Sequence, residues 1–397
     1  MRWGGPDGRM VASDTSSGSD STIGWSVDWE ATPPRELWRK EIGIGFSSFT
    51  VQDGRVFTMG RDGDQDLIVA LDWESGDEIW SVRLDVPLFD NLHEGGPGAT
   101  PTLFEDKLIT VSRDGQTRCL SQADGTEIWR ADLSELTGIE PPEWGFTTSP
   151  WVGQPAGSET RLALFEVGSL VALDANDGTL VWKTEPAQPG YGSPTVFDHG
   201  GQPYVASLNN ERLIVCRLPG GEQVAATDWE SRFRTAAASP LIQGDLCFLS
   251  SGYQAGCAQY RFDGSGLELL YDNRNMSNHM NPCVLIDGTL YGIDGNSDRS
   301  RLCRLVALDW ETGEELWAER GYGCGSVVGC GDRLVVLSDE GLLAVVRAQR
   351  DRFEEVARLQ ILEGRCWTVP VLVGNRLLAR TAAGTVVALE LPPVTAP

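Results

Sequence analysis

The sequence predicts an all-β protein, a single eight-bladed β-propeller of four-stranded blades with almost no helix. Three observations support this fold class. A strand–turn–strand unit ending in Trp recurs along the chain, a short Pro-containing motif marks eight strand starts, and the two ends of the chain complement each other. Recurrence at such periods is typical of one repeat domain and not of two unrelated domains.

The strand–turn–strand unit is clearest at residues 305–317, which read LVALDWETGEELW. Its apolar run predicts a buried strand, Asp and Gly predict a tight turn, and the closing Trp predicts a large apolar anchor. The unit recurs at residues 67–80, 119–129 and 170–182, and each turn Gly precedes its Trp by four residues. We expect the anchors that pin neighbouring blades together to be Trp38, Trp80, Trp129, Trp182 and Trp317.

A second motif fixes the number of blades. A small residue followed by Pro, or a close variant, precedes an apolar strand eight times at intervals of 42–52 residues, which is room for four short strands each. Pro is tolerated there because the first residue of a strand need not donate to the sheet. The eight starts are Ser48-Phe49, Thr100-Pro101, Ser149-Pro150, Ser193-Pro194, Ser239-Pro240, Asn281-Pro282, Ser326-Val327 and Val369-Pro370.

The two ends of the chain predict how the ring closes. We expect residues 1–35 to be a polar lead strapped to the body, residues 36–391 to be the propeller, and residues 392–397 to be a Pro-rich tail. The segment ELWRKEI around Trp38 is half of the recurring unit, and the last interval ends at VVALEL without its outermost strand. Pairing the two would close the ring with an N-terminal strand in the last blade and remove open sheet edges.

Composition excludes several classes of function. With 57 acidic and 32 basic residues the net charge is −25, which argues against nucleic acid and anionic membranes as partners and favours solubility. None of the nine cysteines forms C-x-x-C, although a disulfide between Cys324 and Cys330 stays open. No apolar run is long enough to span a membrane. The first residues lack a signal-peptide pattern, so a cytoplasmic location stays open.

The repeat units resemble a known family. ALDWESGDEIW, ALDANDGTLVW and ALDWETGEELW are similar to the repeat of quinoprotein (PQQ) dehydrogenase-type propellers, whose non-catalytic relatives include the outer-membrane assembly lipoprotein of the Bam complex. GPGATPTLF in the 95–104 region, LEGRCWTVPVL at 362–372 and the opening RWGGPDGR resemble the bacterial PQQ-binding-like β-propeller proteins. The resemblance covers residues 36–391, and it implies an exported, periplasmic, monomeric propeller.

The resemblance leaves three functions to compare. PQQ dehydrogenases carry a vicinal Cys–Cys ring over the cofactor, and no two cysteines here are adjacent. We therefore predict a non-enzymatic binding or scaffolding propeller with no cofactor and no catalytic residues. The alternatives are a PQQ-dependent oxidoreductase acting on alcohols or sugars, and an outer-membrane protein assembly factor.

The segments that lead into each innermost strand are rich in aromatic residues, Arg and His. In a propeller these segments line the mouth of the central channel. We expect the mouth to bind a protein partner or a small-molecule or saccharide ligand, since these residue types are typical of binding sites. The alternative is that they plug the channel by packing on one another. The candidate residues are Phe46, His93, Glu94, Trp144, Phe146, Tyr191, Arg234, His279, Tyr322, Arg365 and Trp367.

Two loops carry oxygen ligands at alternate positions. Such spacing is seen in calcium loops, although the terminal bidentate Glu of an EF-hand is missing. Polar hairpin turns use the same residues, and we favour that interpretation over calcium. The weak metal candidates are Asp62, Asp64, Asp66, Asp294, Asn296 and Asp298. The three histidines lie on separate blades and come with no nucleophile motif, which favours structural roles.

Overall fold

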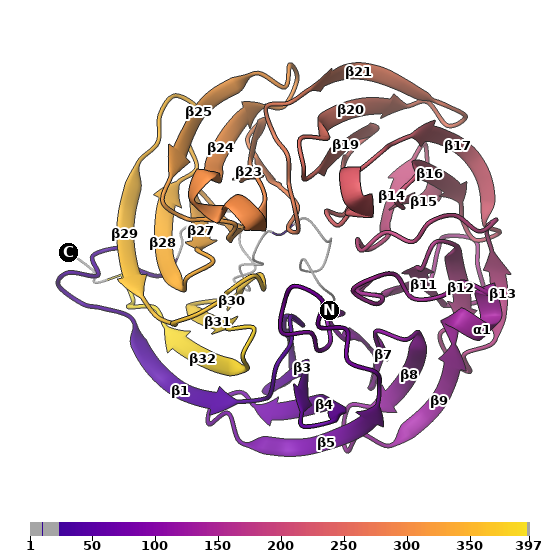
Figure 1. The fold of residues 1–397 in the computed structure, drawn as a ribbon, viewed down its shortest axis with the longest axis horizontal. Coiled ribbons are helices and arrows are strands. Elements are labelled where there is room, and N and C mark those ends of the chain that lie inside the picture. The colour runs from indigo at the N-terminus through magenta and orange to yellow at the C-terminus, as the bar shows by residue number, and fades with distance from the viewer. Residues whose placement is uncertain (1–9, 11–23, 395–397) are drawn as a thin grey trace.

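The protein forms a ring of eight four-stranded antiparallel sheets around a central channel (Figure 1). A computed structural model describes residue 10 and residues 24–394. The chain passes round the ring in sequence order, from indigo blade 1 to the yellow blade 8 in Figure 1. The predicted all-β fold with eight four-stranded blades is confirmed.

Blades 1–4 are meanders in which each strand pairs with the next along the chain, from the channel outward. Blade 1 holds β2 (Thr50–Gln52), β3 (Arg55–Asp62), β4 (Gln65–Asp72) and β5 (Glu78–Asp85). Blade 2 holds β6 (Thr102–Phe104), β7 (Lys107–Val111), β8 (Gln116–Ser121) and β9 (Glu127–Asp132). Blade 3 holds β10 (Trp151–Gly153), β11 (Leu162–Glu166), β12 (Leu170–Asp174) and β13 (Leu180–Lys183). Blade 4 holds β14 (Thr195–His199), β15 (Gln202–Leu208), β16 (Arg212–Arg217) and β17 (Glu222–Asp228).

Blades 5–7 repeat this meander, and blade 8 takes its fourth strand from the other end of the chain. Blade 5 holds β18 (Leu241–Gln243), β19 (Leu246–Ser251), β20 (Gly256–Phe262) and β21 (Leu267–Asn273). Blade 6 holds β22 (Val284–Ile286), β23 (Thr289–Asp294), β24 (Arg304–Asp309) and β25 (Glu315–Arg320). Blade 7 holds β26 (Ser326–Cys330), β27 (Arg333–Leu337), β28 (Leu342–Arg347) and β29 (Glu355–Gln360). Blade 8 holds β30 (Val371–Val373), β31 (Arg376–Arg380), β32 (Thr385–Glu390) and β1 (Arg35–Glu41).

Helical structure in the described residues is limited to short turns between strands. The α-helix α1 spans Leu133–Thr137, and two 3₁₀ turns, η1 and η2, span Arg232–Arg234 and Ser297–Leu302. In Figure 1 both 3₁₀ turns lie beside the central opening. None of these helices in the described part of the chain has the length and apolar character needed to cross a membrane.

Each anchoring Trp packs into the turn of the following blade. The indole Nε1 of Trp80 donates to the Gln122 carbonyl at 3.0 Å, and a Cβ on the blade 2 turn glycine, Gly125, would stand 2.7 Å from the Trp80 ring. Only glycine leaves room for this stacking. The same arrangement joins Trp38 to Gly76, Trp129 to Gly178 and Trp182 to Gly221.

The ring closes as the sequence predicts. Strand β1 pairs antiparallel with β32, so that Arg35 faces Glu390 and Glu41 faces Thr385. Trp38 in β1 also packs on the turn of blade 1. The strand β1 therefore belongs to blade 8 and at the same time anchors blade 1. Without β1, the outer edge of β32 would be an unpaired sheet edge, as the incomplete last repeat in the sequence indicates.

The recurring small residue at each blade start has a structural role at the channel. The backbone N–H of Ser48 donates to the Thr100 hydroxyl at 3.0 Å, and that of Thr100 donates to the Ser149 hydroxyl at 2.9 Å. Ser149 donates in the same way to Ser193, and Ser193 to Ser239, each at 2.8 Å. A small hydroxyl residue is therefore needed at these starts because it accepts a hydrogen bond from the preceding blade.

The hydrophobic core lies between the blades and not at the centre of the ring. Separate buried clusters fill neighbouring interfaces, such as blades 1 and 2 around Trp80, and blades 2 and 3 around Phe165. A larger cluster joins blades 6–8 with Trp25 and Trp29. Cys324 is a buried free thiol in this cluster, so the disulfide to Cys330 is not formed. The centre of the ring is thus left to polar groups and to the site described next.

Candidate functional site: the mouth of the channel

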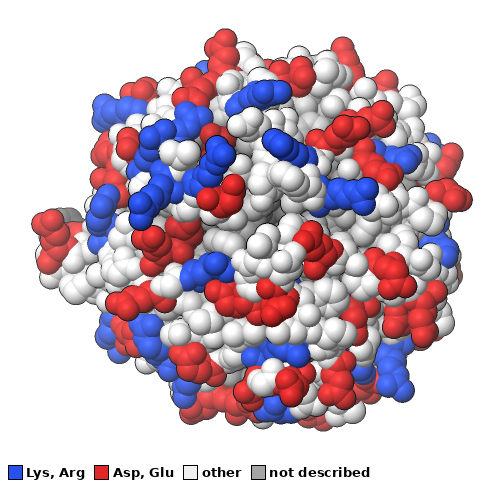
Figure 2. Space-filling view, viewed as in Figure 1, with Lys and Arg blue, Asp and Glu red and all other residues white. Residues whose placement is uncertain are grey.

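A cavity of about 470 Å³ opens at one mouth of the central channel. Figure 2 shows the hollow at the centre of this face, with uncharged atoms at its edge and charged side chains of both signs further out. The loops before the innermost strands of blades 1–6 and 8 form its wall, as expected for a propeller. Seven of the candidate residues lie on this wall: Phe46, His93, Trp144, Tyr191, His279, Arg365 and Trp367.

Five of these side chains form a continuous aromatic wall. Phe46 stacks on Trp367 with ring centroids 5.8 Å apart and meets the edge of His93 at 5.1 Å. His93 packs near Trp144 at 6.4 Å, and Trp144 packs on Tyr191 at 5.6 Å. This packing fills the side of the channel formed by blades 8 and 1–4, while the cavity stays open beside it. The candidates therefore pack on one another and line a cavity at once.

Arg365 lies at the edge of this wall. Its guanidinium sits over the Trp367 ring, 4.4 Å from the centroid, and donates to the Glu94 carboxylate at 2.6 Å. Both charged side chains are about one-third exposed. Glu94 thus reaches the site through its ion pair with Arg365.

Three candidates lie away from the cavity. Phe146 is fully buried between blades 2 and 3, because Gly145 turns the chain at a φ of 69° between it and Trp144. Tyr322 is buried and bonds Glu355 with its hydroxyl at 2.5 Å. Arg234 lines a separate groove and donates to the Gln188 side chain at 3.0 Å.

Arg113 is the important cavity residue that the sequence interpretation missed. It follows β7, is 3% exposed, and lines the cavity behind Phe46. One terminal nitrogen donates to the Trp144 carbonyl, while Nε has no partner among the described residues. In the sequence it looks like part of an ordinary turn, SRDG. Aligning the blades gives a signal, because Arg61 and Arg113 both follow their blade starts by 12 residues.

Burial controls the protonation of the cavity wall. Desolvation, helped by Arg113 and Arg365, lowers the pKa of His93 to about 4, so His93 is neutral at pH 7. Desolvation also lowers the pKa of His279 to about 4 and that of Arg113 to about 10. The pKa of Tyr191 is raised, chiefly by burial. At neutral pH the wall therefore presents neutral rings and the Arg113 and Arg365 cations.

The opposite wall of the cavity comes from blades 5 and 6. Tyr253 packs edge-on against His279 at 4.9 Å, and Phe233 packs on Tyr253 at 5.0 Å. Asp298 in η2 supplies a carboxylate on this side. The cavity thus has cations toward blades 8 and 2 and a carboxylate toward blade 6.

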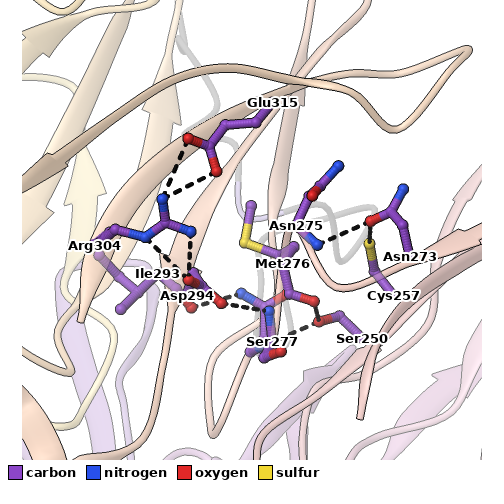
Figure 3. A network of polar contacts seen from close by, with 11 residues as sticks. Ser250, Cys257, Asn273, Asn275, Met276, Ser277, Ile293, Asp294, Arg304 and Glu315 are labelled. Carbon is purple, nitrogen blue, oxygen red and sulfur yellow. Dashed lines mark hydrogen bonds and ion pairs between the residues drawn. The ribbon is translucent and has the colours of Figure 1, made fainter. Parts of the chain in front are cut away.

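Most side chains of the two Asp-rich loops bond to neighbouring residues, whereas Asp298 lines the cavity. Asp66 accepts from Arg61 at 2.8 Å, and Asp62 accepts from Arg83 at 3.2 Å, whereas Asp64 contributes its backbone carbonyl to Arg61. Figure 3 shows the second loop, where Arg304 lies between Asp294 and Glu315. The described residues contain no group of three His, Cys, Asp or Glu placed to hold a metal ion.

A second hollow of about 610 Å³ adjoins the cavity across η1 and η2. We call it the arginine groove, after its lining residues Arg232, Arg274 and Arg299. Arg301 is exposed in the same turn. Two large apolar side chains also line the groove in an exposed position, Phe233 at 62% and Leu302 at 55% exposure. Figure 2 shows several Lys and Arg side chains on the upper side of the central hollow.

The cavity does not suit the calcium-assisted binding of PQQ. A calcium ion takes six to eight oxygen ligands, mostly carboxylates and carbonyls. Among the described residues that line the cavity, Asp298 is the one carboxylate, and it stands on the wall opposite Arg113. No adjacent cysteines occur in the chain. We therefore derive no redox step for this site.

Comparison with known proteins gives relatives of two kinds. The outer membrane protein assembly factor BamB of Salmonella typhimurium is 26% identical over 77% of this chain and 76% of its own length. The polyvinylalcohol dehydrogenase of a Pseudomonas species is 29% identical over 45% of this chain, which spans about a quarter (26%) of that enzyme.

Solved structures share the fold. BamB from Moraxella catarrhalis covers 90% of this chain with a TM-score of 0.64 at 14% identity, and 97% of that protein is matched. The quinohemoprotein alcohol dehydrogenase of Comamonas testosteroni covers 91% with a TM-score of 0.52 at 12% identity, and 77% of it is matched. A family model described as outer membrane protein assembly factor BamB matches residues 6–137 and 113–218, together more than half of the 397 residues. The chain therefore belongs to the family of the outer membrane protein assembly factor BamB.

Proposed function

We propose that this protein is a non-catalytic scaffold in the bacterial envelope that binds a protein partner during outer-membrane protein assembly. The observation that carries the proposal is the arginine groove beside the channel mouth. The family and the name of the Salmonella relative support the process, and the groove supports the mode of action.

The apolar side chains around the mouth favour a protein partner. Phe233 and Leu302 are exposed in the arginine groove, and Leu92, 81% exposed, lies at the cavity. Phe233 and Leu92 have positive φ angles of 62° and 66°, a conformation that costs a non-glycine residue free energy. A fold that holds large apolar side chains outward in this way is typical of an interaction surface.

The charges of the groove point the same way. In a chain of net charge −25, Arg232, Arg274 and Arg301 make no ion pair with any described residue, and Arg299 approaches Asp298 only at 4.0 Å. Arg, Trp and Tyr are enriched among the hot spots of protein interfaces, and Tyr253 lines the groove together with these arginines. An acidic partner surface would gain both charge complementarity and apolar contact.

Site-specific photo-crosslinking in the source bacterium tests this function. A photoreactive residue replaces Phe233 or Leu302 in the groove, and Leu269 of β21, which is 50% exposed on the rim of blade 5, serves as the control. We expect adducts with an outer-membrane assembly protein from the groove positions and not from position 269. Mass spectrometry of the adduct identifies the partner.

A charge-reversal variant gives the second arm. Arg232→Glu with Arg299→Glu should abolish the groove adduct, whereas Arg130→Glu on the outer strand β9 should leave it unchanged. Equal adducts from positions 233 and 269, or an adduct that survives charge reversal in the groove, would contradict the proposed function.

A further inference from the structure

The inner ends of blades 8, 1 and 2 bury more positive than negative charge. Arg380, Arg61 and Arg113 are all less than 8% exposed, and Asp66 is the buried carboxylate among them. Burying an ion without a partner is costly, so each charge must be compensated by the protein or by something bound to it.

Two of the three arginines are held by the protein away from the cavity, although Arg380 has no carboxylate partner and its Nε has no hydrogen-bond partner among the described residues. Arg61 forms an ion pair with Asp66 at 2.8 Å. Arg380 donates to the carbonyls of Ser47, Met59 and Gly43 at 3.0, 2.7 and 3.0 Å. The contacts of Arg380 hold the segment on both sides of Phe46, and neither Arg61 nor Arg380 lines the cavity.

Arg113 is the exception. Within the described residues its guanidinium has one hydrogen-bond acceptor, the Trp144 carbonyl, and no carboxylate. Burial lowers the pKa of Arg113 to about 10 and that of Arg380 to about 9, so the two cations differ in their position relative to the cavity and not in the direction of this shift. Unlike Arg61 and Arg380, Arg113 lines the cavity. The cavity therefore offers an anion a buried charged donor.

The other residues that line the cavity indicate what the uncharged part of that anion should be. Phe46, Trp144, Tyr191 and Trp367 present flat apolar surfaces, and His93 is neutral at pH 7. Hydroxyls of Ser149 and Ser193 are already used as acceptors within the ring of blade starts. Rings stack on rings and guanidinium pairs with carboxylate in two parallel hydrogen bonds.

The negative groups of the site limit the ligand to one charge. Glu94 is held by Arg365 at the edge of the wall, and Asp298 stands on the far side, near Arg299. A second carboxylate at the far end of a ligand would meet Asp298 and be repelled. The volume of about 470 Å³ accepts one molecule of ordinary ligand size.

We propose that this cavity is a binding site for an aromatic monocarboxylate, with the carboxylate paired to Arg113 and the ring packed among Phe46, Trp144 and Trp367. The residues that would contact the ligand lie on the wall opposite the arginine groove and none of them lines that groove, so the proposal does not rest on the proposed function. Its ligand differs from a polyanionic quinone cofactor because the cavity has a single uncompensated cation.

Titration calorimetry with three matched compounds tests the ligand class on the full-length protein. The probes are 2-naphthoate, the neutral 2-naphthamide and the dianion 2,6-naphthalenedicarboxylate. We expect 2-naphthoate to bind at least tenfold more tightly than either of the others. It should also raise the melting temperature, since a ligand that binds only the folded state stabilises it.

Variants test the placement. Arg113→Met should weaken 2-naphthoate at least tenfold and remove its preference over the amide, whereas Arg130→Met, on the surface of the same blade, should leave both unchanged. Met280→Trp should block the cavity without touching Arg113, and it decides the matter if Arg113→Met does not fold. Failure of 2-naphthoate to bind, equal binding of acid and amide, or undiminished binding in Met280→Trp would each overturn the proposal.

Discussion

At the scale of single residues, the glycine of a repeat turn contributes to stability where the anchoring tryptophan of the preceding blade packs directly on it. Gly125 and Gly54 both have a φ of +73°, but a Cβ on Gly125 would stand 2.7 Å from the Trp80 ring, whereas a Cβ on Gly54 would meet no atom within 4 Å. The two positions therefore separate the cost of backbone conformation from the cost of displacing Trp80.

We expect Gly125→Ala to destabilise the protein by about 1–3 kcal/mol more than Gly54→Ala, because forcing extra atoms into a packed site costs this amount. Both share the conformational cost of about 1 kcal/mol for a left-handed residue. Chemical denaturation followed by tryptophan fluorescence measures the difference. Equal midpoints for the two variants would mean that the Trp–Gly contact contributes nothing beyond the turn itself.

Arg365 provides the second residue-scale prediction. Its partners are Glu94 at 2.6 Å and the face of Trp367, and all its contacts lie in the half-exposed mouth. Exposed ion pairs and cation–π contacts each contribute less than about 1 kcal/mol. We expect Arg365→Ala to lower the free energy of unfolding by no more than about 1 kcal/mol, measured in urea. A severe loss would show that Arg365 holds the aromatic wall together.

The sequence predicted the aromatic half of the site better than its charges. Phe46, Trp144 and Trp367 were found because they precede blade starts, and a loop at that place must reach the channel. Phe146 could not be separated from Trp144, since the turn at Gly145 decides which of the two faces the cavity. Arg113 lies at the end of a second strand, and its burial depends on loops from other blades that no local pattern reveals.

At the scale of secondary-structure elements, β1 carries more than its seven residues suggest. It completes blade 8 by pairing with β32, and Trp38 at its centre packs on the turn of blade 1. Its role was predictable from the sequence. The first repeat unit lacks its inner strands and the last blade lacks its outermost strand, so pairing the two completes a blade. The strand positions followed from the repeats, but the 3₁₀ turns η1 and η2 did not, since they occur in single blades.

Deleting residues 1–42 should therefore open the ring. We expect a large fall in melting temperature and aggregation, because β32 then exposes an unpaired edge and the blade 1 turn loses its Trp. Calorimetry and light scattering measure the two effects. Deleting residues 1–9 alone, which leaves both β1 and the buried Met10 in place, is the matched control. If the protein lacking residues 1–42 had the same melting temperature as the intact protein, closure of the ring by β1 would be refuted.

At the scale of the whole molecule, the large negative net charge should lower the stability of the folded state. A charge of −25 spread over one domain produces self-repulsion, which dissolved salt screens over about 10 Å at 0.1 M. We expect the melting temperature at pH 7 to rise as sodium chloride increases from low ionic strength. Near pH 4.5, where the net charge approaches zero, the same salt series should change it little. A flat response at pH 7 would show that ion pairs already balance the repulsion.

The meeting of the two chain ends has a consequence for connectivity. Trp25 forms a bridge with Pro393, and the Ser26 N–H donates to the Pro392 carbonyl at 2.7 Å. A short linker could join these ends, and the chain could be reopened at the exposed turn between Gly200 and Gly201. Such a circular permutant keeps the 32 strands of the described residues, and the four strands of blade 8 become continuous in sequence. Its melting temperature should be close to that of the parent protein. The permutation changes the order of the strands along the chain but keeps every strand pairing in the ring.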